Sequence, residues 1–197
     1  MNRVSLGAGS LGLRRLGWIA AGLLISGVVL AADRQASDEA RETVDGLLGQ
    51  VEQRLAVAPD VAMAKWNSGA PINAPEREAQ ILERVVVEAQ QQGVDQQLAR
   101  AFFQDQFDAS KAVQQQLHQQ WQQASQPPFD NPPDLASDVR PQLDTLTPQL
   151  IQSLHEYQSL EDEPAALQYF EDNAARAVAD HEYAEALEMA LSSLREE

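Results

Sequence analysis

Two neutral polar side chains, a serine hydroxyl and a glutamine amide, stand four residues apart in the segment 105–121, DQFDASKAVQQQLHQQW. The segment has helical character, so Ser110 and Gln114 lie on one helical face. Surface helices usually carry lysine and glutamate there, whereas hydroxyl and amide groups offer hydrogen bonds without a titrating charge. The pair therefore has two interpretations: a polar face toward solvent, or neutral donors that hold oxygen atoms of a ligand.

The few basic residues are the second group that could do chemistry. Arg54 lies among apolar residues in VEQRLAVA, and Lys65 is the only charged residue between Asp60 and Glu76. Arg77 stands at the start of an expected helix, where a positive charge opposes the helix dipole. Each could be an ordinary surface charge paired with an acid. Placed together, such cations would instead bind an anionic ligand.

The charge balance of the chain makes these cations unusual. Three of the 14 basic residues lie within residues 1–32 and all 30 acidic residues lie within residues 33–197, which leaves 11 basic against 30 acidic residues, a net charge of −19 for residues 33–197. Such a chain is repelled by nucleic acid and by anionic lipid, so neither is expected as a partner. The sequence has no cysteine, and its three histidines form no metal-ligand pattern, so we expect no metal site.

Residues 1–32 have the order of a secretory signal peptide. They contain no acid, begin with basic residues, continue through the apolar stretch WIAAGLLISGVVL and end in small residues at LAAD. The apolar stretch has about 13 residues, fewer than the roughly 20 that span a bilayer. We expect cleavage near Ala31 and Ala32, export to the periplasm or beyond, and no membrane association of the remaining domain, residues 33–197. An uncleaved membrane anchor is the alternative.

The rest of the chain shows helical periodicity and no strand alternation. Helices are expected at about 37–57, 75–92, 94–124 and 137–160, with one or two more before residue 197. The segment DVAMAKW is either a turn or a short helix. Pro75 lies near the start of one helix, Gly93 ends it, and the connector SQPPFDNPPDL separates two others. The prediction is an all-α fold, a single domain of about five to six helices.

Several motifs follow one another at definite spacings: Arg54, Lys65 eleven residues later, PINAPERE with Arg77 twelve residues further on, FFQDQFDASKAVQ, and PPDLASDVRPQLDTL. Their order and spacing resemble those of the secreted, all-helical chorismate mutases (AroQ type, gamma subclass). The resemblance covers roughly residues 50–150, with active-site segments at about 50–145, and extends more loosely to the C-terminal helices. It implies a chorismate mutase II-like fold, the substrate chorismate and no cofactor; a homodimer and a monomer are both compatible with it.

The resemblance also implies the chemistry. Chorismate mutases convert chorismate to prephenate by an intramolecular Claisen-type rearrangement, in which one C–O bond breaks while one C–C bond forms. The protein folds the substrate and stabilises charge growing on its ether oxygen, which is electrostatic preorganisation without covalent catalysis. By this resemblance Lys65 and Gln114 donate to the ether oxygen, and Ser110 donates to a carboxylate. Because an amide donates at any pH, activity should be level through neutral pH.

The remaining roles that the resemblance implies concern the ends of the substrate. Arg54 and Arg140 would hold the two carboxylates, with Arg54 counted among the catalytic residues beside Lys65 and Gln114. Arg77 would support this cluster, and Glu78 would accept a hydrogen bond from the ring hydroxyl. The complete set of expected substrate-binding residues is Arg54, Lys65, Arg77, Glu78, Ser110, Gln114 and Arg140.

The sequence departs from the family pattern in two places. Ala74 stands where the family often has an aspartate, so a helix cap or a hydroxyl contact is absent unless Asn73 supplies it. The spacing from PPDL to Arg140 is one residue longer than in some relatives. Lys111 and His118 are expected on the solvent-exposed surface.

Two other functions fit the sequence. One is a non-catalytic helical binding or adaptor protein of the periplasm, which would carry its basic residues dispersed over its outside. The other is a relative that keeps the fold and has lost the activity, with Ala74 as the first sign.

Overall fold

The helices of this protein begin and end at residues whose chemistry explains their position. The computed structural model describes residues 36–195, and every regular element of that range is helical. α2 (Asp38–Leu55) begins where the Ser37 hydroxyl accepts the N–H of Ala40 at 3.0 Å. α3 (Ala58–Ser68) follows almost directly and ends at Gly69, whose φ of 68° favours glycine.

The next two helices form an antiparallel pair. α4 (Pro75–Gln91) has proline at its first position, as the sequence predicts. α5 (Gln96–Gln123) is 28 residues long and begins at Asp95, whose carboxylate accepts two backbone N–H groups at 2.8 and 2.9 Å. Gly93, with a φ of 87°, makes the turn between them, so the predicted end of α4 is also confirmed.

The second half of the chain contains a π-helical turn and three more α-helices. The π turn (Leu135–Val139) leads into α6 (Arg140–Gln158). It is followed by α7 (Pro164–Asp180), α8 (Ala184–Ala190) and a short 3₁₀ turn (Ser192–Leu194). The segment DVAMAKW is thus part of a helix, and two helices, α7 and α8, lie at the C-terminal end, where one or two were expected. The all-α prediction is confirmed.

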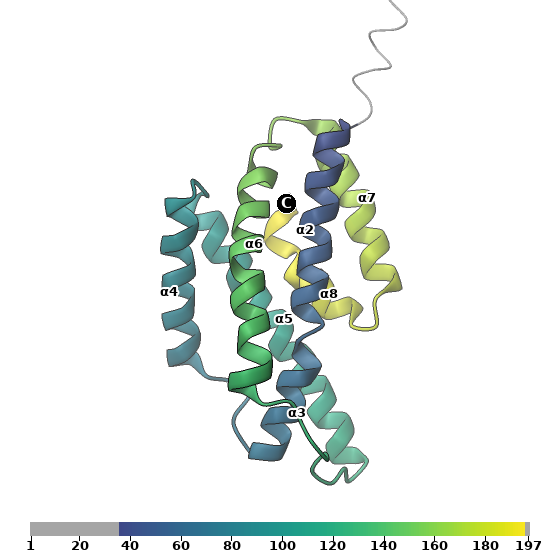
Figure 1. Cartoon of the computed structure of the whole chain (residues 1–197). Coiled ribbons are helices and arrows are strands. Elements are labelled where there is room, and N and C mark those ends of the chain that lie inside the picture. The colour runs from purple at the N-terminus through teal and green to yellow at the C-terminus, as the bar shows by residue number, and fades with distance from the viewer. Residues whose placement is uncertain (1–35, 196–197) are drawn as a thin grey trace, which may run out of the picture. The chain divides into compact units, whose positions relative to one another are not determined.

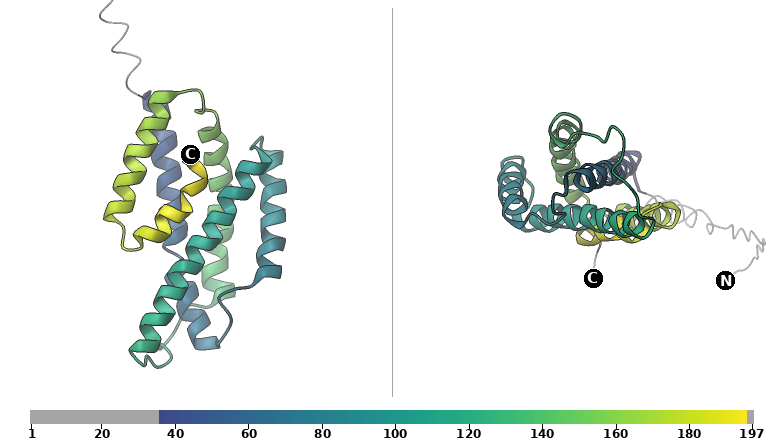
Figure 2. Two further views of the ribbon diagram at one scale, coloured as in Figure 1. Left: turned by 180° about the vertical axis from the view of Figure 1, so that it is seen from behind. Right: turned by 90° about the horizontal axis from the view of Figure 1, so that it is seen from below.

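The packing of these helices places the site. In Figure 1, α2 lies between α6 and α7, and the view from behind in Figure 2 shows α5 crossing beside α8. α4 packs against α5 and α6 at one edge. The interior is filled by fully buried side chains of α2, α5, α6 and α7, including Leu47, Phe102, Phe103, Leu150 and Phe170.

The expected signal peptide, residues 1–32, lies outside the described residues. The described residues, 36–195, belong to one compact unit. Among the residues that the structure describes, no helix has the length and apolar character that a membrane span needs.

Gly93 gives a prediction about stability. An added Cβ atom would lie 3.2 Å from Cε1 of His155, and the positive φ disfavours any side chain. Gly93→Ala is therefore expected to lower the free energy of unfolding by about 1–2 kcal/mol. Gly46→Ala is the matched control, because this exposed glycine of α2 has open space around an added Cβ; alanine there should raise the free energy of unfolding by about 0.5–1 kcal/mol. Urea denaturation measures both, and equal effects would contradict strain at Gly93.

Candidate active site

One cavity of about 540 Å³ lies among α2, α3, α4, α5 and α6. Every substrate-binding residue that the sequence analysis expects lies on its wall, although these residues come from five different helices. The cations are therefore gathered in one place, unlike the dispersed arrangement expected of a binding or adaptor protein. The expected residues on the wall are Arg54, Lys65, Arg77, Glu78, Ser110, Gln114 and Arg140.

Arg54 is a buried cation in the last turn of α2, with 8% of its surface exposed. Its guanidinium carbon lies 5.6 Å from the centre of the Phe107 ring, and its Nε atom has no hydrogen-bond partner among the described residues. Burial lowers the pKa of Arg54 from its ordinary value to about 10. Buried charges in proteins are normally paired. This guanidinium is therefore suited to receive an anionic group of a ligand.

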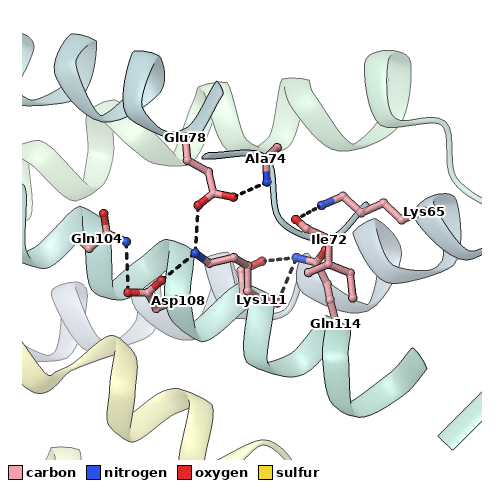
Figure 3. Close-up of polar contacts among 9 residues, drawn as sticks. Lys65, Ile72, Ala74, Glu78, Gln104, Asp108, Lys111 and Gln114 are labelled. Carbon is pink, nitrogen blue, oxygen red and sulfur yellow. Dashed lines mark hydrogen bonds and ion pairs between the residues drawn. The ribbon is translucent and has the colours of Figure 1, made fainter. Parts of the chain in front are cut away.

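Lys65, in the last turn of α3, spans the loop between α3 and α4. Its Nζ atom donates to the carbonyl oxygen of Ile72 at 2.9 Å, as Figure 3 shows. Burial is the main cause of a lowered pKa of Lys65. The Glu78 carboxylate opposes this shift, whereas the charges of Arg77 and Lys111 add to it. Lys65 is thus a half-buried cation surrounded mostly by other cations.

Ser110 and Gln114 meet on one face of α5, as their spacing predicts. Gln114 is only 3% exposed, and its Nε2 atom donates to the carbonyl oxygen and the hydroxyl oxygen of Ser110 at 3.0 and 3.1 Å. Its Oε1 atom is buried and has no hydrogen-bond partner among the described residues. The solvent-exposed interpretation of Gln114 is therefore wrong. Because rotation exchanges the two ends of an amide, this side chain can present either a donor or an acceptor to a ligand.

The first turn of α4 shows how the chain manages without an aspartate at position 74. Ala74 precedes the helix and makes no side-chain cap. Oε1 of Glu78 instead accepts the N–H of Ala74 at 3.0 Å, while the N–H of Glu78 donates to the Ala74 carbonyl at 2.9 Å. Asn73 is exposed, and the bond that fixes this turn comes from Glu78. The expectation that Asn73 replaces the missing aspartate receives no support from this geometry.

The surface position expected for Lys111 is wrong. Its side chain is 20% exposed and lies on the cavity wall. Nζ of Lys111 contacts Oε2 of Glu78 at 2.9 Å and Oδ1 of Asp108 at 2.8 Å, and Gln104 donates to the other oxygen of Asp108 at 3.1 Å (Figure 3). Burial lowers the pKa of Lys111, but the bonds to Asp108 and Glu78 outweigh burial and raise it.

The surface position expected for His118 is also wrong. Its Nε2 atom lies 2.9 Å from the carbonyl oxygen of Ala62, which ties α5 to α3. The imidazole ring packs 5.2 Å from the ring of Trp66 and 5.5 Å from that of Trp121, measured between centroids. His118 is therefore part of an aromatic cluster that holds α3 on α5.

Arg140 reaches the cavity because a π turn precedes its helix. Asp134 caps that turn by accepting two backbone N–H groups at 2.8 Å, and these bonds lower the pKa of its carboxyl. The N–H of Val139 then bonds the Asp134 carbonyl at 3.2 Å, and that of Arg140 bonds the Leu135 carbonyl. Because each of these bonds spans five residues, the turn holds more residues than an α-helical turn does. Val139 is buried against Val57 at the junction of α2 and α3, which fixes where α6 begins.

The cavity has the opposite charge balance to the chain. Six basic and two acidic residues line it, whereas the whole sequence has 14 basic and 30 acidic residues. Arg84 is a lining residue that the sequence did not lead us to expect, although it stands two turns after Arg77 on the same face of α4. Within residues 36–195, no group of histidine, aspartate and glutamate side chains is placed to hold a metal ion. The basic residues are Arg54, Lys65, Arg77, Arg84, Lys111 and Arg140, and the acidic ones are Glu78 and Asp144.

Comparisons with known proteins show which family the chain is similar to. The family model for "Chorismate mutase type II" matches residues 44–115. A secreted chorismate mutase of Mycolicibacterium smegmatis is 29% identical over 137 residues, 66% of this chain and 75% of that protein. A chorismate mutase of Methanocaldococcus jannaschii is 33% identical over 93 residues, 47% of this chain and 91% of that protein.

A solved structure extends the similarity over most of the fold. The crystal structure of a chorismate mutase from Burkholderia thailandensis superposes with a TM-score of 0.70 at 37% identity, covering 78% of this chain and 99% of the other. The similarity thus includes nearly the whole of two relatives, 91% of one and 99% of the other. The chain belongs to the type II chorismate mutase family.

Proposed function

We propose that this protein catalyses the rearrangement of chorismate to prephenate. The observation that carries the proposal is the cavity in which cations and neutral donors from five helices converge. Chorismate has two carboxylates, a ring hydroxyl and an ether oxygen, so a cavity rich in cations and poor in acids complements it. The rearrangement needs no nucleophile and no cofactor, and positioning with charge stabilisation is what fixed cations can supply.

Arg54 and Arg140 are proposed to hold the two carboxylates of the substrate. The buried guanidinium of Arg54 has an Nε atom without a partner among the described residues, and a bidentate carboxylate would satisfy it. Arg140 is exposed on the cavity wall and would hold the second carboxylate, supported by the exposed charge of Arg77. The substrate would then be fixed at both ends before the reaction begins.

Lys65 and Gln114 are proposed to act on the reacting atoms. As the C–O bond breaks, negative charge grows on the ether oxygen, and two donors fixed beside that oxygen would stabilise it. Lys65 supplies a charge and Gln114 a neutral N–H. Ser110, which accepts from the Gln114 amide, would turn its own hydroxyl proton to a substrate carboxylate. Glu78 would accept a hydrogen bond from the ring hydroxyl of the substrate. Its carboxylate oxygens have further lone pairs besides those that accept from the Ala74 N–H and from Nζ of Lys111.

Lys65→Ala tests the proposed function. The purified full chain is expected to consume chorismate, followed by the loss of its ultraviolet absorbance. The variant should lose about 10²-fold or more in kcat/KM, because a donor to the developing charge is removed. Arg100→Ala is the control, since this exposed arginine of α5 lies outside the cavity wall. A loss below about threefold for Lys65→Ala would count against its role.

The same purified protein also distinguishes an active enzyme from a relative that keeps the fold and has lost the activity. It would leave chorismate unchanged and still be stabilised by a dicarboxylate that mimics the transition state. At about 100 times its Kd, such a ligand raises the free energy of unfolding by roughly 2.7 kcal/mol. An adaptor protein would show neither turnover nor this stabilisation.

Export is proposed from the sequence and from the secreted relatives. We expect residues 1–32 to be removed near Ala31 and Ala32, which leaves residues 33–197 as the exported enzyme. The mass of the protein recovered from the periplasm or medium measures the cleavage point. A homodimer is a further proposal, to be measured by sedimentation; all of the proposed substrate-binding residues lie in one chain.

A further inference from the structure

The hydrogen bonds around Glu78 connect the start of α4 to the middle of α5. Oε1 of Glu78 accepts from the backbone of Ala74, and Oε2 accepts from Nζ of Lys111 at 2.9 Å. Lys111 is held in turn by Asp108 at 2.8 Å, and Gln104 holds the second oxygen of Asp108 (Figure 3). The chain of contacts thus runs from the wall of the cavity back along α5, and it fixes the direction of the Glu78 carboxylate.

The two charged groups at the centre of this network are well shielded from water. The side chains of Lys111 and Glu78 are 20% and 24% exposed. Charge-assisted bonds of this length are stronger than neutral ones and hold a definite geometry. An exposed ion pair of the same length would contribute little order. The Lys111–Glu78 contact is therefore suited to keep a carboxylate in one orientation.

Glu78 has a second cation within its electrostatic reach. The carboxylate acts on the charge of Lys65, where it opposes the lowering of the pKa by burial. Even so, Nζ of Lys65 donates to the Ile72 carbonyl, and no ion pair joins it to Glu78 in the described part of the chain. A carboxylate released from Lys111 would be drawn toward other cations of the cavity wall, and Lys65 is one on which it already acts. It would then neutralise a charge on which the proposed reaction depends.

We propose that Lys111 is a positioning residue that holds the Glu78 carboxylate away from Lys65 and so keeps the Lys65 charge available to the substrate. Asp108 and Gln104 extend this role by holding Lys111. The inference rests on the proposed function of the cavity. It assigns Lys111 an effect on turnover that acts through another side chain and needs no contact with the substrate.

A double-mutant cycle on Lys111 and Glu78 tests this role. Lys111→Met should lower kcat by about 10- to 100-fold, because the freed carboxylate competes for Lys65. Glu78→Gln alone should act mainly on KM, since it weakens the contact to the ring hydroxyl. In the Glu78→Gln background, Lys111→Met should change kcat by less than about threefold, because residue 78 then carries no negative charge that could neutralise Lys65. Equal losses of kcat in both backgrounds would overturn the proposal.

Two further variants separate positioning from folding or net charge. Lys111→Arg keeps a donor and a charge beside Glu78 and should retain most of kcat. Arg100→Gln removes one positive charge from the same helix about three turns away, and should leave kcat unchanged. A loss for Arg100→Gln that matches the one for Lys111→Met would overturn the proposal in favour of a general charge effect.

A readout without substrate keeps the inference separate from the proposed activity. The sequence contains only two lysines, Lys65 and Lys111, so carbon-13 labelling of lysine gives two side-chain signals, of which Lys111→Met leaves one. Titration of that signal reports the pKa of Lys65 directly. Lys111→Met should raise it more with Glu78 present than in the Glu78→Gln background. Equal shifts would overturn the positioning role even in an active enzyme, whereas absent turnover with unequal shifts would contradict only the proposed function.

Discussion

Replacing Arg54 by methionine is expected to abolish most of the activity and to stabilise the fold at the same time. The loss of activity should reach about 10²-fold or more in kcat/KM, because a fixed cation in a shielded cavity contributes strongly to binding and to charge stabilisation. Methionine fills a similar volume and adapts to irregular apolar surroundings such as those beside Phe107. The substitution therefore removes the charge without leaving a large void.

The gain in stability follows from the desolvation of the guanidinium. Burial lowers the pKa of Arg54 to about 10, so the folded protein binds this proton less tightly than the unfolded chain does. At neutral pH both states are protonated, and the unfavourable cost of burying the charge is fully present. It is relieved only as the pH rises through about 10, where the folded protein loses the proton first. Arg54→Met should therefore raise the free energy of unfolding at pH 7 by about 1–3 kcal/mol.

Urea denaturation of the free protein, measured together with chorismate turnover, checks both effects. The control is Arg100→Met, which removes an exposed charge from α5 and should change the free energy of unfolding by less than about 0.5 kcal/mol. If Arg54→Met proves less stable than the parent, the guanidinium has a stabilising partner and is not held ready for a ligand.

Replacing Gln114 by glutamate is expected to make the activity depend on pH. A carboxyl group donates a hydrogen bond only while it is protonated, so turnover should fall about tenfold for each pH unit above the pKa of the new side chain. The cations on the cavity wall favour the charged form and keep that pKa low. Turnover by the variant should therefore be retained at acid pH and largely lost at pH 7, whereas the parent stays level through neutral pH.

The pH–rate profiles of the two proteins measure this difference. Gln115→Glu is the matched control, because Gln115 is exposed on the same helix, and its profile should follow the parent. A parent profile that drops steeply above pH 7, or a Gln114→Glu profile as level as the parent, would remove Gln114 from the reacting centre.

Local chemistry explains why most helix ends and several site residues could be predicted. Pro75, Gly93 and the serine and aspartate caps act within a few residues, so their effect is visible in the sequence. Arg54 could be recognised as a candidate site residue, because a charge among apolar neighbours cannot reach water easily. In contrast, the position of Lys111 on the cavity wall could not be predicted, because its partner Glu78 stands 33 residues away in the sequence. Helical periodicity indicates which face a residue occupies, but not which helix will lie opposite that face.

The sequence motifs predicted Arg140 as a site residue, but they did not predict the π turn that precedes it. The connector enters α6 through the π-helical backbone hydrogen bonds of Leu135–Val139. The sequence contains no signal specific to a π turn. The buried contact of Val139 with Val57 forms only in the folded chain, so the start of α6 is set by packing.

The π turn at Leu135–Val139 has a consequence for how related enzymes are compared. Had α6 itself been extended by one residue, Arg140 would be rotated by about 100° around the helix axis and would leave the cavity. A widened turn placed before the helix can take up a residue while the angular phase of α6 stays the same. In relatives with shorter or longer connectors, the equivalent arginine should therefore be sought by its phase on α6 rather than by counting residues from the preceding motif.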